Sequence, residues 1–274
     1  MNTAPLPTRA SPPPAFGEHL RRWRQQRRLS QLDLAQEADI STRHLSFVET
    51  GRSMPSREMV LRLAERLDVP LRERNALLVA AGYAPMYRER PLDDPALAAA
   101  RSAVELVLRS HEPFPALAVD RHWNLVAANR MLPHLLAGVD ASLLQAPVNV
   151  LRLSLHPEGL ASRIVNLVQW REHLFERLRQ QVHATADSVL SDLLAELRAY
   201  PVPAGAGDVP TLDGEHLGVV MPLRFRSRFG VLNFISTTTI FGTPVDVTLQ
   251  ELALETFFPA DENTAQVLRS LPPA

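Results

Sequence analysis

The sequence predicts two units of different fold class. The first is all-α, with five short helices, and the second is α/β, with helices accompanying an antiparallel sheet. Three observations support this prediction: apolar residues recur at helical spacing through residues 16–82, a Pro-rich and charged linker interrupts them at residues 83–95, and alternating apolar residues appear only beyond it. The 274 residues suffice for two domains. The second unit is predicted over residues 96–274, and residues 1–15, with five prolines, are expected to be disordered.

The first predicted helix is amphipathic. Phe16, Leu20 and Trp23 fall on one face. The other face carries a row of arginines, namely Arg21, Arg22, Arg24, Arg27 and Arg28. Such a row is either a solvated helix face or part of a surface that contacts a polyanion.

Three serines predict where the next helices begin. Ser30, Ser41 and Ser56 each precede an apolar run of helical spacing, and a Ser side chain at the N-cap accepts a hydrogen bond from the first turn. Gly51 is the expected stop of the third helix, because Gly readily adopts the left-handed conformation beyond a helix end. A fifth helix is predicted over residues 71–81.

The second unit begins with a helix near residues 95–110. Two short strand-like runs follow, PALAVD and WNLVAAN, with a tight connection around Arg121 and His122. A long helical stretch is predicted over residues 159–199.

The last part of the chain alternates as β-strands do. After a loop rich in Pro and Gly, Val219, Met221, Leu223 and Phe225 face one way. A second strand, FGVLNFISTTTIF, follows directly. The run VDVTLQELALETFF is predicted to be a further strand whose apolar phase slips near Gln250, as a β-bulge would produce, before a short C-terminal helix.

Charge divides the chain in the same way as the apolar pattern. Residues 1–90 contain 15 Arg against 10 Asp and Glu, and the remainder contains 14 against 20, so the two parts carry +5 and −6. This asymmetry indicates a first part that meets an anion such as nucleic acid and a second part that does not.

The absence of two residue types excludes several kinds of site. Without Lys there is no Walker A phosphate loop and no Schiff-base lysine, and without Cys there is no disulfide and no thiolate metal site. The His residues show no metal-ligand spacing, and the GAGDVP loop fails the dinucleotide fingerprint, so we expect no metal and no cofactor. The sequence shows no signal peptide and no apolar run of membrane length, which predicts a cytoplasmic protein with no membrane partner.

Residues 29–56 carry the pattern most informative about function. They predict two short helices joined by a tight turn, and such a pair fits the major groove of double-stranded DNA. The second helix then reads base edges with side chains near its N-terminus, namely Thr42, Arg43, His44, Ser46 and Phe47. His44 is also interpretable as a solvent-facing residue.

The residue types suggest individual contacts. Arg43 is suited to a bidentate contact with guanine, and Phe47 or the methyl group of Thr42 is suited to a thymine methyl. Phosphate contacts that fix the register are expected from Gln31, Arg52, Ser53 and Arg57. Because one recognition helix reads few base pairs, we expect a homodimer on a two-fold operator.

The stretch FGxxLRxWRxxRxLSQxxLA, followed by the third helix and ETGRSxPS, resembles the Xre-type helix-turn-helix domain of phage repressors and bacterial regulators. The resemblance covers most of residues 16–82 and implies sequence-specific DNA binding. Asp39 stands where that family commonly has Gly at the turn, and Asp tolerates the left-handed conformation.

In the second half, PALAVDRHWNLVAAN, NVLRLSLHPEGL and LLAELRAYP resemble the ligand-binding domain of MmyB-like transcription regulators. This resemblance implies a PAS-like sensor and a small, apolar ligand such as a fatty acyl group. The candidate ligand contacts are Trp123, Asn129, His156, Trp170, Met221, Phe225 and Phe234. The aromatic residues are also interpretable as domain core, Asn129 as a helix N-cap and His156 as a loop residue.

An enzyme and a protein-binding adaptor are the two alternatives to a transcription regulator. An enzyme is not expected, because there is no GxSxG elbow and no HExxH motif, and because Glu172 and His173 point to different helix faces. The sequence does not exclude a DNA-binding adaptor or antitoxin whose second half binds a protein partner.

Overall fold

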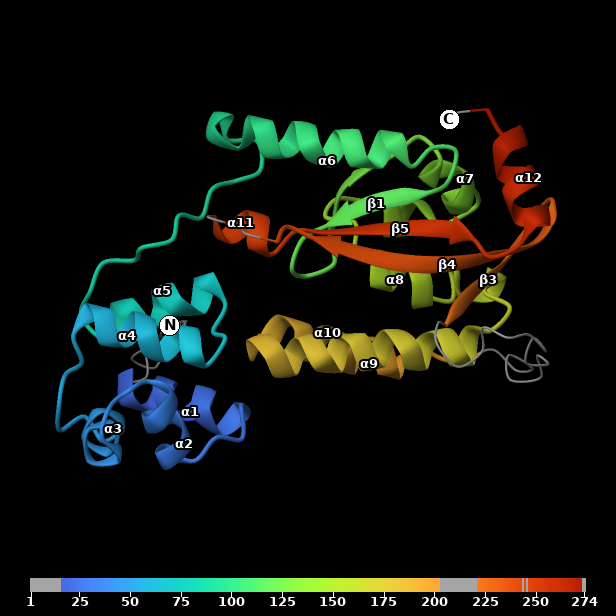
Figure 1. Cartoon of the computed structure of the whole chain (residues 1–274). Coiled ribbons are helices and arrows are strands. Elements are labelled where there is room, and N and C mark those ends of the chain that lie inside the picture. Colours follow the sequence, from blue (N-terminus) through green and yellow to red (C-terminus); the bar gives the residue numbers. More distant parts are fainter. Residues whose placement is uncertain (1–15, 203–220, 243, 245, 273–274) are drawn as a thin grey trace, which may run out of the picture. The chain divides into compact units, whose positions relative to one another are not determined.

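The computed structural model describes residues 16–202, 221–242, 244 and 246–272. The chain divides into two compact units, Met1–Arg88 and Glu89–Ala274 (Figure 1). The predicted fold class, an all-α unit followed by an α/β unit with an antiparallel sheet, is confirmed. The expected disorder of residues 1–15, the position of Val219 and most of the Pro- and Gly-rich loop lie outside the described residues.

Within its described residues the first unit contains five helices: α1 (Phe16–Gln26), α2 (Gln31–Glu37), α3 (Thr42–Glu49), α4 (Arg57–Arg66) and α5 (Leu71–Ala80). Ser30, Ser41 and Ser56 cap α2, α3 and α4, each accepting a hydrogen bond from a backbone N–H of the first turn, which confirms the three predicted starts. Asp39 and Gly51 have φ values of 55° and 71°, so the left-handed conformations expected at these two positions are also confirmed.

The core of the first unit is built on leucines with no exposed surface, including Leu20, Leu34, Leu45 and Leu63. Helix α1 approaches the end of α3 so closely that a Cβ on Gly17 would lie 2.3 Å from a backbone oxygen. Only Gly fits at this position, and the close approach fixes the angle at which α3 is held.

The described helices of the second unit are η1 (Pro95–Leu97), α6 (Ala98–Ser110), α7 (Leu132–Leu136), η2 (Ala141–Leu144), α8 (Val150–Leu155), η3 (Ala161–Arg163), α9 (Leu167–Thr185), α10 (Ser188–Ala199), α11 (Val247–Gln250) and α12 (Glu262–Ser270). The strands are β1 (Ala116–Val119), β2 (Leu125–Ala128), β3 (Pro222–Ser227), β4 (Gly230–Ile240) and β5 (Ala253–Pro259). They form one antiparallel sheet in the order β2-β1-β5-β4-β3.

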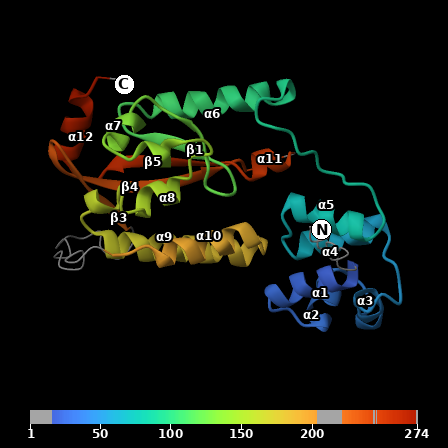
Figure 2. The ribbon, with the colours of Figure 1, turned by 180° about the vertical axis from the view of Figure 1, so that it is seen from behind.

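The sheet has two covered faces, and β1 shows how alternation assigns side chains to them. Leu117 and Val119 join the core beneath α8, α9 and α10, whereas Ala116 and Ala118 pack with Val104 of α6 on the opposite face. Helix α6 lies along one side of the sheet and α8–α10 along the other (Figure 1; from behind, Figure 2).

Two element predictions are wrong. The run predicted as one strand with a bulge near Gln250 is the short helix α11 followed by β5, because Asp246 caps a helical turn that accounts for the apolar phase slip. The single helical stretch over residues 159–199 is interrupted: Ala186 adopts a left-handed φ of 55° and ends α9, and Asp187 caps α10.

Candidate DNA interface and ligand pocket

The N-terminal half of α3 presents side chains on the surface of the first unit. Arg43 is exposed, and its guanidinium carbon lies 5.4 Å from the ring centroid of Phe47, within the range of a cation–π contact. Thr42 and Ser46 are half-buried beside them. His44, whose backbone N–H donates to Ser41 Oγ at 3.1 Å, is also half-buried.

The opposite side of α3 is apolar. Leu45 and Val48 are buried in the core, as predicted for residues that do not read DNA. Helix α3 therefore has one packed face and one accessible face, which is the division that a recognition helix requires.

The four residues expected to hold phosphates differ in their surroundings. Arg52 and Arg57 are exposed, and the Arg52 guanidinium lies 5.9 Å from the Phe47 ring centroid. Ser53 is half-buried. Gln31 is half-buried, and its side chain is bound inside the protein because Nε2 donates to Glu49 Oε2 at 2.8 Å.

The interpretation of Arg24 as part of an arginine-rich solvated or DNA-facing surface is wrong. Its side chain is buried and donates to both carboxylate oxygens of Glu49, Nε to Oε1 at 2.6 Å and Nη2 to Oε2 at 2.9 Å. The hydrogen bond to Glu49 is the largest cause of a raised pKa of Arg24. Arg24 thus ties α1 to the end of α3, and Arg21, Arg22 and Arg28 remain exposed on the helix and its end.

The second unit contains an apolar pocket of about 90 Å³ between the sheet and the helices. Trp123, Trp170 and Phe225 line it, so three of the predicted ligand contacts are brought together. Aliphatic side chains from β1, α7, α8 and α9 form most of the remaining wall, among them Leu117, Leu132, Leu135, Leu151 and Leu174. Such a lining favours a lipophilic ligand.

One ion pair lies at the edge of this pocket. Arg177 Nη2 is 2.7 Å from Glu255 Oε1, and Nη1 is 3.3 Å from Oε2. The Glu255 side chain is only 5% exposed, and Arg177 also donates to Thr238 Oγ1 at 2.8 Å. The ligand pocket therefore contains one charged pair whose charges cancel.

The other four predicted ligand contacts lie elsewhere. Phe234 is fully buried in the same core and Met221 packs against that core, but neither lines the pocket. Asn129 binds the backbone of Phe114 and Ala116 and so fastens the start of β1. His156 follows α8, where its Nδ1 accepts from the backbone of the next-but-one residue.

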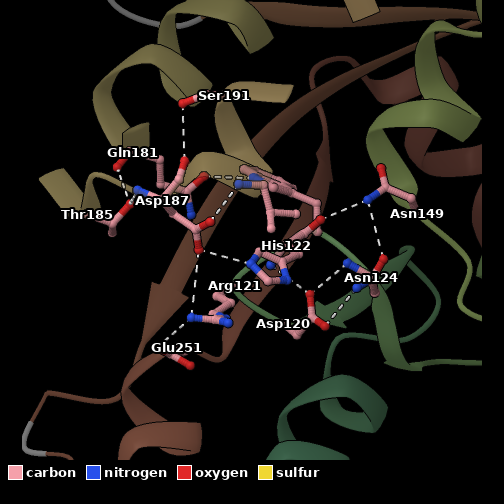
Figure 3. Close-up of polar contacts among 12 residues, drawn as sticks. Asp120, Arg121, His122, Asn124, Asn149, Gln181, Thr185, Asp187, Ser191 and Glu251 are labelled. Carbon is pink, nitrogen blue, oxygen red and sulfur yellow. Dashed lines mark hydrogen bonds and ion pairs between the residues drawn. The ribbon is translucent and has the colours of Figure 1, made fainter. Parts of the chain in front are cut away.

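The hairpin that connects β1 and β2 positions Trp123. Figure 3 shows the polar contacts of the neighbouring Asp120, His122 and Asn124. Asp120 Oδ1 accepts from the backbone N–H groups of His122 and Asn124, both at 2.8 Å. His122 Nε2 lies 2.9 Å from Asp187 Oδ2, which connects the turn to the start of α10. Trp123 itself has a left-handed φ of 66°, a conformation rarely adopted by a bulky residue.

Sequence reasoning did not identify Arg177 and Glu255. Arg177 lies seven residues after Trp170 on α9, a spacing of two helical turns. The sequence therefore predicts that both side chains lie on the same helix face. Glu255 lies on a strand among apolar residues, and its burial depends on the ion pair with Arg177 on a different element.

Across the described residues no group of three or more His, Cys, Asp or Glu side chains has the arrangement of a metal site. No described helix is both long enough and apolar enough to span a membrane.

Two family models match the chain. The MmyB-like transcription regulator ligand binding domain matches residues 100–271, and a helix-turn-helix model matches residues 20–74. Among solved structures, the chain is similar to the clp gene regulator ClgR from Corynebacterium glutamicum, with 25% sequence identity, coverage of 37% of this chain and 99% of that chain, and a TM-score of 0.23. No curated protein matches the sequence.

Proposed function

The chain belongs to the MmyB-like transcription regulators, and from this premise we propose that its second unit binds an apolar, acyl-type ligand that controls operator binding by a homodimer. DNA binding through the helix-turn-helix and ligand binding through the second unit follow from the family. The apolar ligand, the individual contact residues and the homodimer extend beyond it.

The apolar lining of the pocket is the observation that supports an apolar ligand. Its wall is almost entirely aliphatic and aromatic, and its charged pair is internally neutral. Each methylene buried there contributes about 0.8 kcal/mol, so a saturated chain gains affinity with length until the space is filled. Trp123, Trp170 and Phe225 are the proposed contacts, joined by Arg177 and Glu255.

For DNA, the accessible face of α3 supports the assignment of Thr42, Arg43, Ser46 and Phe47 as base contacts, with His44 at the margin. Arg52, Ser53 and Arg57 are the proposed phosphate contacts. Gln31 retains a second amide hydrogen for a phosphate while the first binds Glu49.

A homodimer is supported by the size of the recognition surface. One helix reads too few base pairs for selectivity in a genome, and two helices must be about 34–36 Å apart to reach successive major grooves. Helix α6 also exposes Leu106 and Val107, which would be buried favourably in a subunit interface.

Arg43→Ala is expected to weaken binding to a selected operator by about 1–3 kcal/mol, because a bidentate guanine contact is lost, and to leave non-specific binding nearly unchanged. Arg52→Ala is the matched control and should weaken binding to all sequences and reduce the salt dependence. Salt titrations on operator and random duplexes measure both. Equal losses on the two duplexes for Arg43→Ala would remove it from the base-reading residues.

The experiment that tests the ligand proposal is thermal unfolding of the full chain with alcohols of increasing chain length, compared with citrate and AMP. The second unit should become more stable as the alkyl chain of the alcohol lengthens. At an alcohol concentration one hundred times Kd, the stabilisation should be about 2.7 kcal/mol. Stabilisation by only the polar compounds would contradict the proposal.

A further inference from the structure

A second cavity adjoins the ligand pocket. This groove has a volume of about 350 Å³, and its lining includes Trp123, Arg177, Gln180, Gln181, Thr238 and Glu251. Trp123 and Arg177 line both the groove and the apolar pocket. These two side chains are therefore the partition between an apolar space and a polar one.

The partition is part of the packed second unit, in which Trp123 is 6% exposed and belongs to the core. The Arg177 guanidinium carbon lies 4.8 Å from the Trp123 ring centroid. Trp123 Nε1 donates to Gln181 Oε1 at 2.7 Å, and the left-handed backbone of Trp123 is not the one that its side chain favours. Opening the partition therefore requires Trp123 to leave the core, which breaks its hydrogen bond to Gln181 and its contact with Arg177.

The size of the apolar pocket makes this partition relevant to binding. Its 90 Å³ is smaller than the roughly 150 Å³ cavity that accommodates benzene, whereas small-molecule sites span about 300–1,000 Å³. A long-chain ligand fits only if it continues past Trp123 and Arg177 into the groove.

The charges around Trp123 and Arg177 determine which head group the ligand can carry at the end of its alkyl chain. Arg177 is the one basic residue among the described residues that line the groove, and Glu255 already pairs with it. Asp120 and Glu251 also line the groove, and Glu251 pairs with Arg121, whose Nη1 lies 3.8 Å from Glu251 Oε1. Burial, followed by the charge of Arg177, lowers the pKa of nearby His173 and so disfavours its charged form.

A ligand carboxylate would therefore compete with the buried Glu255 for Arg177, and displacement of Glu255 from Arg177 would leave a buried carboxylate without its counter-charge, which is unfavourable. The uncharged polar groups of the groove are the amides of Gln180 and Gln181 and the hydroxyl of Thr238. The Thr238 hydroxyl already bonds Arg177 and Glu255. By contrast, Gln180 Nε2 donates to Glu176 and Gln181 Oε1 accepts from Trp123 Nε1, so each amide keeps further hydrogen-bonding capacity. These groups suit an amide, ester or alcohol.

We propose that the ligand is an uncharged amphiphile, an acyl amide, ester or long-chain alcohol, whose chain fills the apolar pocket and whose head lies in the groove beyond the Trp123–Arg177 partition. Arg177 and Glu255 are the specificity-determining pair, because their mutual neutralisation disfavours a charged head. This inference rests on the proposed apolar ligand and adds its head-group chemistry.

A competing position for an anionic head exists on the other side of the apolar pocket. A cavity of about 300 Å³ shares Leu135 with it and is lined by Arg163 and Arg228, neither of which pairs with a carboxylate of the described residues. Arg163 instead donates to backbone oxygens of Leu135 and Ala137. An acyl anion directed there would contradict the proposal, so the test must separate the two positions.

The test compares three probes of the same chain length, dodecanamide, dodecanol and dodecanoate, by isothermal titration calorimetry with the full chain. The amide and the alcohol should bind at least about tenfold more tightly than the carboxylate, a difference of about 1.4 kcal/mol. Binding of dodecanoate as tight as that of the amide would overturn the proposal. If none of the three binds, the proposed apolar-ligand function itself is wrong. This result differs from tight dodecanoate binding, which overturns only the head-group inference.

Variants locate the head group. Glu255→Gln leaves Arg177 unpaired and should improve dodecanoate affinity by about tenfold without improving that of dodecanamide, whereas Glu172→Gln, on the exposed side of α9, should change neither. If Glu255→Gln does not fold, the affinities of the native protein for the three probes still decide between an uncharged and a charged head group. Tight dodecanoate binding that Arg228→Ala abolishes and the neighbouring Arg226→Ala preserves would place the head at Arg163 and Arg228 and contradict the proposal.

Discussion

Glu49→Ala is expected to destabilise the first unit by about 3–5 kcal/mol, because it leaves the buried guanidinium of Arg24 without its counter-charge. The same change removes the acceptor of Gln31 at the start of α2. Native-state hydrogen exchange of the full chain, followed over residues 16–80, measures this loss separately from the second unit.

Two further variants control this experiment. Glu37→Ala removes an exposed carboxylate from the neighbouring helix α2 and should change the stability by less than about 0.5 kcal/mol. The double change Arg24→Met with Glu49→Leu should recover most of the loss, since an apolar pair of similar volume often replaces a buried ion pair without penalty. A loss no larger for Glu49→Ala than for Glu37→Ala would show that the ion pair does not hold α1 to α3.

Phe225→Ala is expected to destabilise the second unit by about 3–5 kcal/mol, the usual range for truncating a buried Phe. The side chain is 1% exposed, lines the apolar pocket, and has the guanidinium carbon of Arg163 4.4 Å from its ring centroid. Truncation also enlarges the pocket, so a dodecyl compound should stabilise the variant by more than it stabilises the native chain. Urea unfolding with and without dodecanol measures both effects.

Phe229→Ala provides the matched control, because this Phe lies in the turn after β3 and is 44% exposed. Its loss of stability should stay near 1 kcal/mol or less. If Phe225→Ala and Phe229→Ala were equally stable, Phe225 would not be a core element of the pocket.

The helix-turn-helix was predictable because its signals are local. Three serine caps, the left-handed positions at Asp39 and Gly51, and regularly spaced leucines all lie within a few residues of the elements that they define. The alternation of Leu223 and Phe225 likewise predicted β3, because a strand with one buried face needs no information from elsewhere in the chain.

Features that depend on tertiary contacts were not predictable in the same way. Arg24 was placed on a polar helix face because its counter-charge, Glu49, lies 25 positions later. The break between α9 and α10 occurs at Ala186, a residue type that seldom adopts a left-handed φ, although Asp187 was readable as an N-cap. The pocket pair Arg177 and Glu255 depends on the packing of α9 against β5.

Control of DNA binding by a ligand requires that the two units of the chain affect each other, and the segment between Tyr87 and Arg90 joins them. Asn75 of the first unit holds the backbone of Met86 and Tyr87, and Thr248 of the second unit binds the backbone oxygen of Arg90. The segment that joins the units is therefore held to the first unit at Met86 and Tyr87 and to the second unit at Arg90.

The most direct test is the affinity of the full chain for an operator selected from random DNA, with and without a saturating dodecyl probe, at fixed salt. We predict a change of about 5- to 150-fold and, by linkage, the same factor in ligand affinity when operator is bound. A Gly-Ser insertion after Arg88 should preserve both binding activities and abolish the change. Identical operator affinities with and without saturating probe would contradict ligand-controlled DNA binding.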